Sequence, residues 1–180
     1  MLTSDKSKNL MGLGLWLILI AFIFFIPFIP SNPNKELDIS FLDNNGNKNA
    51  LVFFGFRGCS NICPVTLSVL SRLLKSQQDS TYWPQVVFVD IEATSNSVEA
   101  SNYAKKFHPS FIGLHIPPEK IIAVSSQFGL NIKQRDGQIL HIGKTYLLHR
   151  QEKIWSLVKA YNPNSFSVKS LTNELFDINS

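Results

Sequence analysis

Residues 51–67 read LVFFGFRGCSNICPVTL, and this stretch decides the fold of the chain. It opens with an apolar run, Leu51 to Phe54, made of residue types that fill a buried strand. Cys59 and Cys63 follow, four positions apart, and Pro64 stands where a helix can begin, because its missing N–H costs nothing in the first turn. Apolar residues at spacings of three and four then predict a helix. A strand, a cysteine loop and a helix are typical of a thiol site.

Strand-like and helix-like patterns alternate along the rest of the chain. Ser95 and Ser97 are candidate caps at the start of one helix, and Gly129 is a candidate cap at the end of another. The order βαβα followed by ββα predicts an α/β protein with a thioredoxin-like three-layer sandwich. The predicted strands are 37–42, 50–54, 85–91, 143–148 and 153–159, and the predicted helices lie after Cys63 and at 98–107, 120–128 and 167–176, with 111–114 as a connector.

Residues 10–29 carry no charge, and at about 1.5 Å of rise per residue they span roughly the 30 Å hydrocarbon layer of a membrane. A cleaved signal peptide would have a shorter apolar core and small residues at a cleavage site. We therefore predict a cytoplasmic tail (1–9), a transmembrane anchor (10–30), a linker (31–36) and a thioredoxin-like domain (37–180). Lys6 and Lys8 before the apolar run predict a single-pass protein of the inner membrane, with its domain in the periplasm if the cell is bacterial.

The charge of the chain is modest, with 17 Lys and Arg residues against 13 Asp and Glu, a net charge of +4. The basic residues form no stripe interleaved with aromatic residues, which argues against nucleic acid as a partner. The chain has two cysteines, and a structural disulfide is the simplest interpretation of a pair in an exported domain. Against it, the pair closes a loop of only a few residues, so the gain in stability would be small.

Two cysteines at i and i+4 near a helix start are expected to lie on nearly the same face, where the helix N-terminus lowers the pKa of a thiol. Such a pair supports thiol–disulfide exchange, or binding of Cu(I) or, with more ligands, Zn(II). The spacing alone does not choose, although the usual exchange motif has one residue fewer between its cysteines. Among the four histidines, we expect a solvated cap at His108, a packed or exposed ring at His115 and a surface turn at His149. Spacing gives no reason to prefer His141.

A series of short motifs changes this balance. Their order along the chain resembles that of the SCO/SenC family of membrane-anchored copper proteins for cytochrome c oxidase assembly. The resemblance covers Leu51 to the carboxyl terminus, and the amino-terminal anchor is also similar. The motifs are Phe54-Gly55-Phe56, Cys59-x-x-x-Cys63-Pro64, Thr66-Leu67, Val89-Asp90, Ile112-Gly113-Leu114, and His141 five residues before Tyr146-Leu147.

The resemblance implies that Cys59, Cys63 and His141 bind copper, as Cu(I) or Cu(II), which two thiolates and an imidazole suit. It also implies a thioredoxin-like fold and delivery of copper to the binuclear centre of oxidase subunit II, or reduction of that subunit's cysteines; another copper or thiol client is the alternative partner. Asp90 matches an acidic position of the family, which would lie near the metal. The alternative is that Asp90 is a structural residue that caps the end of a strand.

The chain departs from the family pattern at three places near the expected ligands. Ser60-Asn61-Ile62 stands where the family shows Pro-Asp before a variable residue, and Arg57-Gly58 replaces a Thr-His step. Leu140 replaces an Asp beside His141, which removes a group that could orient the imidazole. The leading hypothesis is a copper-binding assembly factor without catalytic turnover. The alternatives are a membrane-tethered thiol–disulfide oxidoreductase, in which Cys59 attacks and Cys63 resolves, and a structural module with a permanent disulfide.

Overall fold

The computed structural model describes residues 14–20, 39, 42, 47–76, 83–130, 132–135, 138–140, 143–163 and 165–179. The chain divides into two units, Met1–Pro33 and Asn34–Ser180. In the first unit, residues 14–20 form a helix, and the rest of the expected anchor, 10–30, lies outside the described residues. Across the ranges that are described, no helix combines the length and the apolar character needed to cross a membrane.

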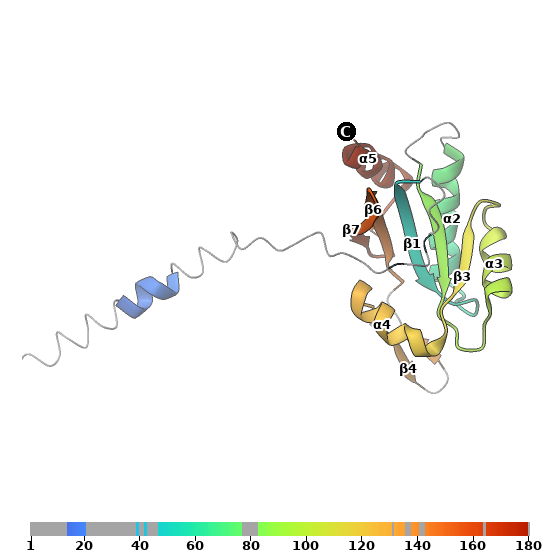
Figure 1. The fold of residues 1–180 in the computed structure, drawn as a ribbon, viewed down its shortest axis with the longest axis horizontal. Helices are drawn as coiled ribbons and strands as arrows, with labels where there is room; N and C mark the ends of the chain where they lie inside the picture. The colour runs from blue at the N-terminus through green and yellow to red at the C-terminus, as the bar shows by residue number, and fades with distance from the viewer. Residues whose placement is uncertain are drawn as a thin grey trace, which may run out of the picture. The chain divides into compact units, whose positions relative to one another are not determined.

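A mixed five-stranded sheet forms the centre of the second unit, in the order β3-β2-β1-β6-β7 (Figure 1). β1, β2 and β3 run parallel, and β6 and β7 are antiparallel to their neighbours. A separate two-stranded sheet is formed by β4 and β5. The strands are β1 (Asn49–Gly55), β2 (Gln85–Asp90), β3 (Ile112–His115), β4 (Lys133–Arg135), β5 (Gln138–Leu140), β6 (Thr145–Gln151) and β7 (Ile154–Tyr161).

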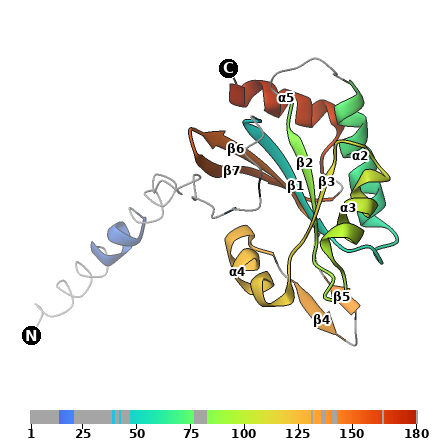
Figure 2. The ribbon, with the colours of Figure 1, turned by 45° about the vertical axis from the view of Figure 1, so that its right-hand side comes forward.

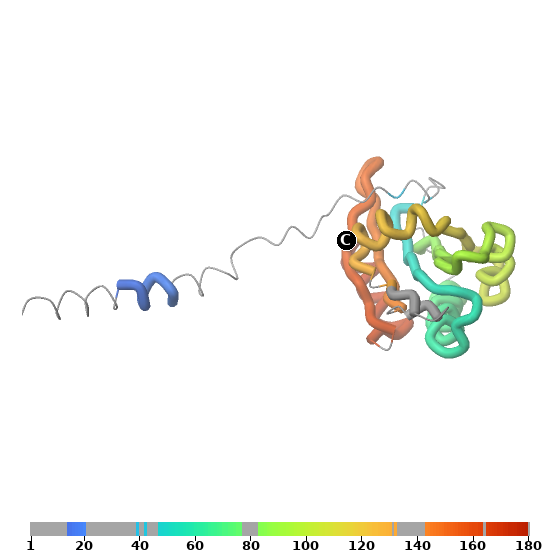
Figure 3. The backbone as a smooth tube through the Cα atoms, turned by 90° about the horizontal axis from the view of Figure 1, so that it is seen from below, coloured from blue at the N-terminus to red at the C-terminus, as the bar shows by residue number. Residues whose placement is uncertain are grey.

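The helices cover the two faces of the five-stranded sheet. α2, α3 and α5 pack on one face and α4 on the other (Figure 2). Figure 3 shows the strands between α4 and α2 from below. This helix–sheet–helix arrangement confirms the predicted three layers. The helices are α2 (Ile62–Ser76), α3 (Ser97–Lys105), α4 (Pro118–Phe128) and α5 (Val168–Asn179).

Each face of the sheet has its own core, and β1 contributes to both. Phe53 packs with Leu67 and Leu171 beneath α2 and α5, whereas Phe54 packs with Phe128 and Tyr146 beneath α4. Every residue of β1 and β2 is buried. Central parallel strands covered on both sides are expected to be apolar throughout, and this explains the continuous apolar run that opens the decisive stretch.

Two local predictions are wrong, and a third falls mostly outside the described residues. The predicted connector 111–114 is largely β3, because it pairs in parallel with β2. Most of the predicted strand 37–42 lies outside the described residues, and its two described members, Ile39 and Leu42, are not in a strand. The amino-terminal cap of α3 is Asn96, whose side chain accepts the N–H of Glu99, and not Ser95 or Ser97. By contrast, Gly129 caps α4 in the left-handed conformation, as predicted.

Candidate functional site

The polar ends of three parallel strands meet at one edge of the sheet. Gly55 of β1 pairs with Asp90 of β2, which pairs with His115 of β3. The loop that leaves β1 at this edge carries Cys59 and leads into α2. Ligands and catalytic groups of open α/β sheets gather at the carboxyl ends of the strands, so this edge is the candidate site.

The two cysteines are brought together by the start of α2. The helix begins at Ile62, so Cys59 precedes it and Cys63 lies in its first turn. The backbone N–H of Cys63 donates a hydrogen bond to Sγ of Cys59 at 3.3 Å. Both thiols are free. The expected proximity is confirmed, but it arises because Cys59 occupies a capping place, where helix N–H groups hold anions, and not because both residues share a helix face.

Cys63 lies beneath the loop, at the edge of the core. Its side chain is fully buried, whereas Cys59 is half-buried. A Cβ on Gly55 would lie 3.0 Å from Sγ of Cys63, so the absence of a side chain at Gly55 makes room for the sulfur. Burial raises the pKa of the Cys63 thiol, and the hydrogen bond with Cys59 raises it further. The prediction that the helix start lowers the thiol pKa is therefore wrong for Cys63, because desolvation outweighs the backbone donors.

A buried carboxylate anchors the cysteine loop. Asp90 has no exposed surface and accepts hydrogen bonds from the Ser95 hydroxyl at 2.6 Å and the Glu92 N–H at 3.0 Å. Arg57 Nε lies 3.4 Å from Asp90 Oδ2, and Arg57 Nη1 lies 3.0 Å from Glu99 Oε1 of α3. Asp90 thus serves as a cap at the strand end, and Arg57 ties the loop to β2 and α3.

Tyr103 of α3 packs against the same core cluster as the two cysteines. Its ring packs 5.1 Å from the Phe88 ring and 5.5 Å from the Phe107 ring. Burial raises the pKa of its hydroxyl to about 12, with smaller contributions from Cys63, Cys59 and Asp90. Tyr103 and the role of Arg57 are not predictable from the sequence, because neither residue belongs to a motif with recognisable spacing.

The histidines lie in different surroundings. His108 Nδ1 is 2.7 Å from Ser110 Oγ at the exposed end of α3, and its pKa is lowered by burial and by Lys75. The ring of His115 is half-buried at the end of β3. His149 lies within β6 and not in a surface turn, so that prediction is wrong; its Nδ1 is 2.8 Å from an Asn49 oxygen.

His141, the third expected ligand, lies outside the described residues, but the chain shortly after it is described. An ideal Cβ on Gly143 would lie 2.9 Å from Cγ2 of Ile62, the residue before Cys63. Gly143 therefore packs directly against the first turn of α2. Within the described part of the chain, no group of three or more His, Cys, Asp or Glu side chains is placed to hold a metal; the cysteines contribute two sulfurs.

Comparison with known proteins identifies the family. The SCO1/SenC family model matches residues 43–175. The chain is 28% identical over 128 residues to the mitochondrial SCO1 homolog 1 of Arabidopsis thaliana, covering 68% of this chain and 38% of that protein. It is 26% identical over 133 residues to an SCO2-like protein of Rickettsia felis, covering 64% and 65%. The match thus spans less than two thirds of either relative.

Solved structures agree with this assignment. Copper-bound ScoI of Arabidopsis thaliana superposes with a TM-score of 0.64 at 28% identity, covering 74% of this chain and 85% of that one. Apo Sco1 of Thermus thermophilus gives a TM-score of 0.61 at 29% identity, covering 74% and 80%. PrxQ of Xylella fastidiosa, at 12% identity and a TM-score of 0.54 over 83% and 98%, shows the fold alone, and confirms the predicted thioredoxin-like architecture. The chain is a member of the SCO1/SenC family.

Proposed function

We propose that this protein binds copper through Cys59, Cys63 and His141 and assists assembly of the binuclear copper centre in subunit II of cytochrome c oxidase. The observation that carries the proposal is that two free thiols lie together at the start of α2. The backbone N–H of Cys63 donates a hydrogen bond to Sγ of Cys59, with 3.3 Å between nitrogen and sulfur. The packing of Gly143 against Ile62 supports it, because it brings the chain that follows His141 to the start of α2.

The donor set suits copper. Two sulfurs and one imidazole are soft or borderline ligands, a combination that binds Cu(I) and can also hold Cu(II). The chain belongs to a family whose Arabidopsis thaliana member has been solved with copper bound, at 28% identity to this chain. A solved relative, BsSco, is described as a member of the Sco family of cytochrome c oxidase assembly proteins.

The site residues have separable tasks in loading and releasing the copper cargo. Copper binding would require both thiols to lose their protons, and the raised pKa of Cys63 makes copper binding compete with a proton at this sulfur. The Cys63 N–H holds the Cys59 sulfur in position before the metal arrives. Arg57 fixes the loop through Asp90 and Glu99, so the sulfur positions depend little on the bound metal.

The membrane topology is part of the same proposal. Residues 10–30 anchor the chain as a single span, with 1–9 in the cytoplasm, 31–36 as a linker and 37–180 on the far side of the membrane. Lys6 and Lys8 support this orientation. This arrangement would place the copper site on the same side of the membrane as an exported client protein that receives copper or thiol electrons.

Copper binding by the full chain tests the proposal. The chain, purified in detergent, reduced and supplied with Cu(I), should hold close to one copper. His141→Ala, Cys59→Ser and Cys63→Ser should each weaken binding by about tenfold or more. His108→Ala is the matched control, because His108 contacts Ser110 at the end of α3 and should leave binding unchanged. A parent chain that holds no copper, or a His141→Ala chain that binds like the parent, would contradict the assignment.

Thiol–disulfide exchange is the second candidate function, and the unequal exposure of the two thiols favours it. The half-buried Cys59 thiolate would attack a client disulfide, releasing one client thiolate and forming a mixed disulfide. The buried Cys63 would then give its proton to the released client thiolate, attack the Cys59 sulfur and release the second client thiolate, so that two electrons pass from the cysteine pair to the client. This alternative would be established if the chain binds no copper and the His141→Ala variant still carries out thiol–disulfide exchange.

A further inference from the structure

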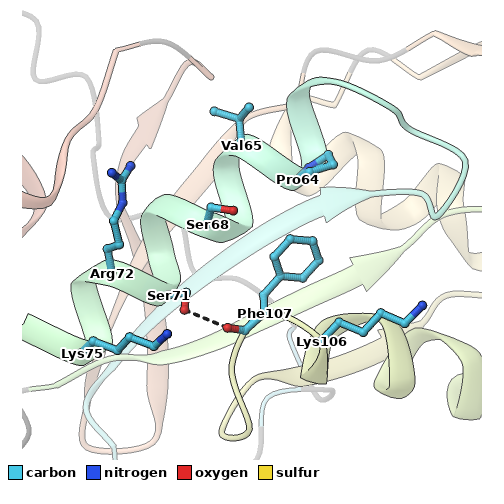
Figure 4. Close-up of a pocket in the computed structure, with 8 residues that line it drawn as sticks. All are labelled: Pro64, Val65, Ser68, Ser71, Arg72, Lys75, Lys106 and Phe107. Carbon is cyan, nitrogen blue, oxygen red and sulfur yellow. Dashed lines mark hydrogen bonds between the residues drawn. The ribbon is translucent and has the colours of Figure 1, made fainter.

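A basic groove lies between α2 and the end of α3, beginning one residue after Cys63. Its volume is about 660 Å³, it is widely open to solvent, and it is distinct from the thiol pair. Figure 4 shows six of its residues along one face of α2 and two at the carboxyl end of α3. We call it the α2–α3 groove, lined by Pro64, Val65, Ser68, Ser71, Arg72, Lys75, Lys106 and Phe107.

The groove carries positive charge without a compensating carboxylate. Arg72, Lys75 and Lys106 are exposed, and the lining contains no Asp or Glu. Within the described ranges, none of these three cations forms an ion pair with a carboxylate. Three unpaired cations along one groove produce a local positive field that attracts negatively charged segments.

The floor of the groove is fixed. The hydroxyl of Ser71, a buried residue of α2, donates a hydrogen bond to the backbone carbonyl of Phe107 at 2.8 Å, and Figure 4 shows this bond crossing the groove floor. It fastens α2 to the segment that follows α3. The two sides of the groove, α2 and the segment after α3, are therefore ordered before a partner binds, which reduces the entropy cost of binding.

The end of the groove nearest the cysteines is apolar. Val65 is 53% exposed and Ile62 is 38% exposed, on either side of the buried Cys63. A segment bound in the groove would therefore place carboxylates beside Arg72, Lys75 and Lys106 and an apolar side chain beside Val65. Cations that follow the length of α2, with an apolar position at one end, suit a protein segment that carries both carboxylates and an apolar side chain.

We propose that the α2–α3 groove docks an acidic, extended segment of the protein that exchanges copper or thiol electrons with Cys59 and Cys63. This inference rests on the proposed function, because it names the kind of partner that the same site serves. Charge complementarity selects the partner and speeds its encounter, and the apolar end directs the partner's reactive group towards Cys59.

The test uses the full chain in neutral detergent and a short fluorescent peptide that alternates glutamate with leucine. The groove variant Arg72→Gln/Lys75→Gln/Lys106→Gln should bind this peptide about tenfold more weakly than the parent at low salt. Raising the salt concentration should weaken peptide binding by the parent and reduce the difference in peptide affinity between the parent and the groove variant. The control variant Lys120→Gln/Lys153→Gln/Lys169→Gln removes the same charge from exposed positions outside the groove and should bind like the parent.

Equal peptide binding by the groove and control variants would overturn the proposal. So would a groove variant that loses binding of monomeric dihexanoyl-phosphatidylglycerol but keeps the peptide, since that result assigns the groove to lipid headgroups. Cu(I) binding without peptide should be the same in the groove variant and the parent. A parent that binds the peptide but no copper would contradict the proposed function and leave the acidic docking site standing.

Discussion

Arg57 Nε lies 3.4 Å from Oδ2 of Asp90, and this ion pair joins the cysteine loop to the end of β2. Asp90 has no exposed surface, whereas the Arg57 side chain is 29% exposed. Removing one member of such a pair leaves a buried charge uncompensated. We expect Arg57→Met to lower the free energy of unfolding by about 2–4 kcal/mol in urea titrations, less than a fully buried pair because Asp90 keeps two hydrogen bonds.

Glu92→Gln is the control for this substitution. Glu92 Oε2 lies 3.7 Å from the same Arg57 nitrogen, and the Glu92 side chain as a whole is 29% exposed, so losing its charge should cost less than about 1 kcal/mol. If Arg57→Met unfolds at the same urea concentration as Glu92→Gln, the buried pair does not hold the loop.

The two thiols should react at different rates. Cys59 is half-buried, whereas Cys63 is buried and burial raises its pKa, so at neutral pH Cys63 remains a protonated thiol. Iodoacetamide should therefore alkylate Cys59 first in the reduced, metal-free chain. Cys63→Ser should keep the fast reaction and Cys59→Ser should lose it, as followed by mass spectrometry. The difference should vanish in urea, and faster labelling of Cys63 in the folded chain would refute the assignment.

Tyr146 should make the protein sensitive to alkali. Its ring is buried between Phe54 and Phe128, its hydroxyl has no hydrogen-bond partner among the residues described, and burial raises its pKa from 10.0 to about 12. Between these values the unfolded chain loses the phenol proton and the folded chain keeps it. The unfolded state is thereby favoured as pH rises, by up to about 1.4 kcal/mol per pH unit, whereas below pH 10.0 the group contributes no slope.

Tyr146→Phe keeps the ring and removes this titration. Its stability in urea should equal or exceed that of the parent near neutral pH, because the substitution removes a buried hydroxyl without a partner, and the advantage should grow in strong alkali. A variant with the same alkaline loss as the parent would show that Tyr146 does not titrate as expected.

Gly143→Ala should disturb the site through Ile62. The new Cβ would lie 2.9 Å from Ile62 Cγ2, which must move, and overpacking of this kind costs about 1–3 kcal/mol. Under the proposed function, Cu(I) affinity should fall as well, as measured by competition with a chelator. Gly58→Ala is the matched control, because its nearest neighbours would lie at an ordinary 3.5 Å.

A second substitution separates crowding from other effects of Gly143→Ala. Ile62→Ala removes the methyl group that the new Cβ would meet, so the double variant should recover Cu(I) affinity relative to Gly143→Ala alone. A double variant that binds copper no better than Gly143→Ala would refute this role for Ile62.

Local signals predicted the central elements of the fold well. The buried strands at 50–54 and 85–91 are predictable because parallel strands covered on both faces contain near-continuous apolar runs, such as 50–54 and 86–89. The segment 111–114 was mistaken for a connector because it is short and contains Gly113, and its strand character comes from pairing with β2. The turn predicted at His149 is wrong because β6 continues through Gln151, and no local residue pattern marks that extension.

The site was predictable only in part, because contacts between distant segments leave no local pattern in the sequence. The cysteine pair was visible in the sequence, and the structure brings the two residues together. Ser95 was a plausible helix cap, but its hydroxyl bonds Asp90, which left Asn96 to cap α3. The partners of Arg57 come from distant parts of the chain, and the burial that raises the Cys63 pKa is a tertiary property that no helix-start signal reveals.

The position of β1 has a consequence for biosynthesis. β1 lies between β2 and β6, and Asn49 pairs with His149, 100 positions later. The ribosome therefore releases the cysteine loop long before the strand that completes the sheet beside it, and pairings so distant in sequence form slowly. Throughout that interval both thiols sit on a nascent chain without their native burial. The native burial of Cys63 and the covering of Cys59 are therefore complete only after β6 and β7 have been synthesised and have joined the sheet.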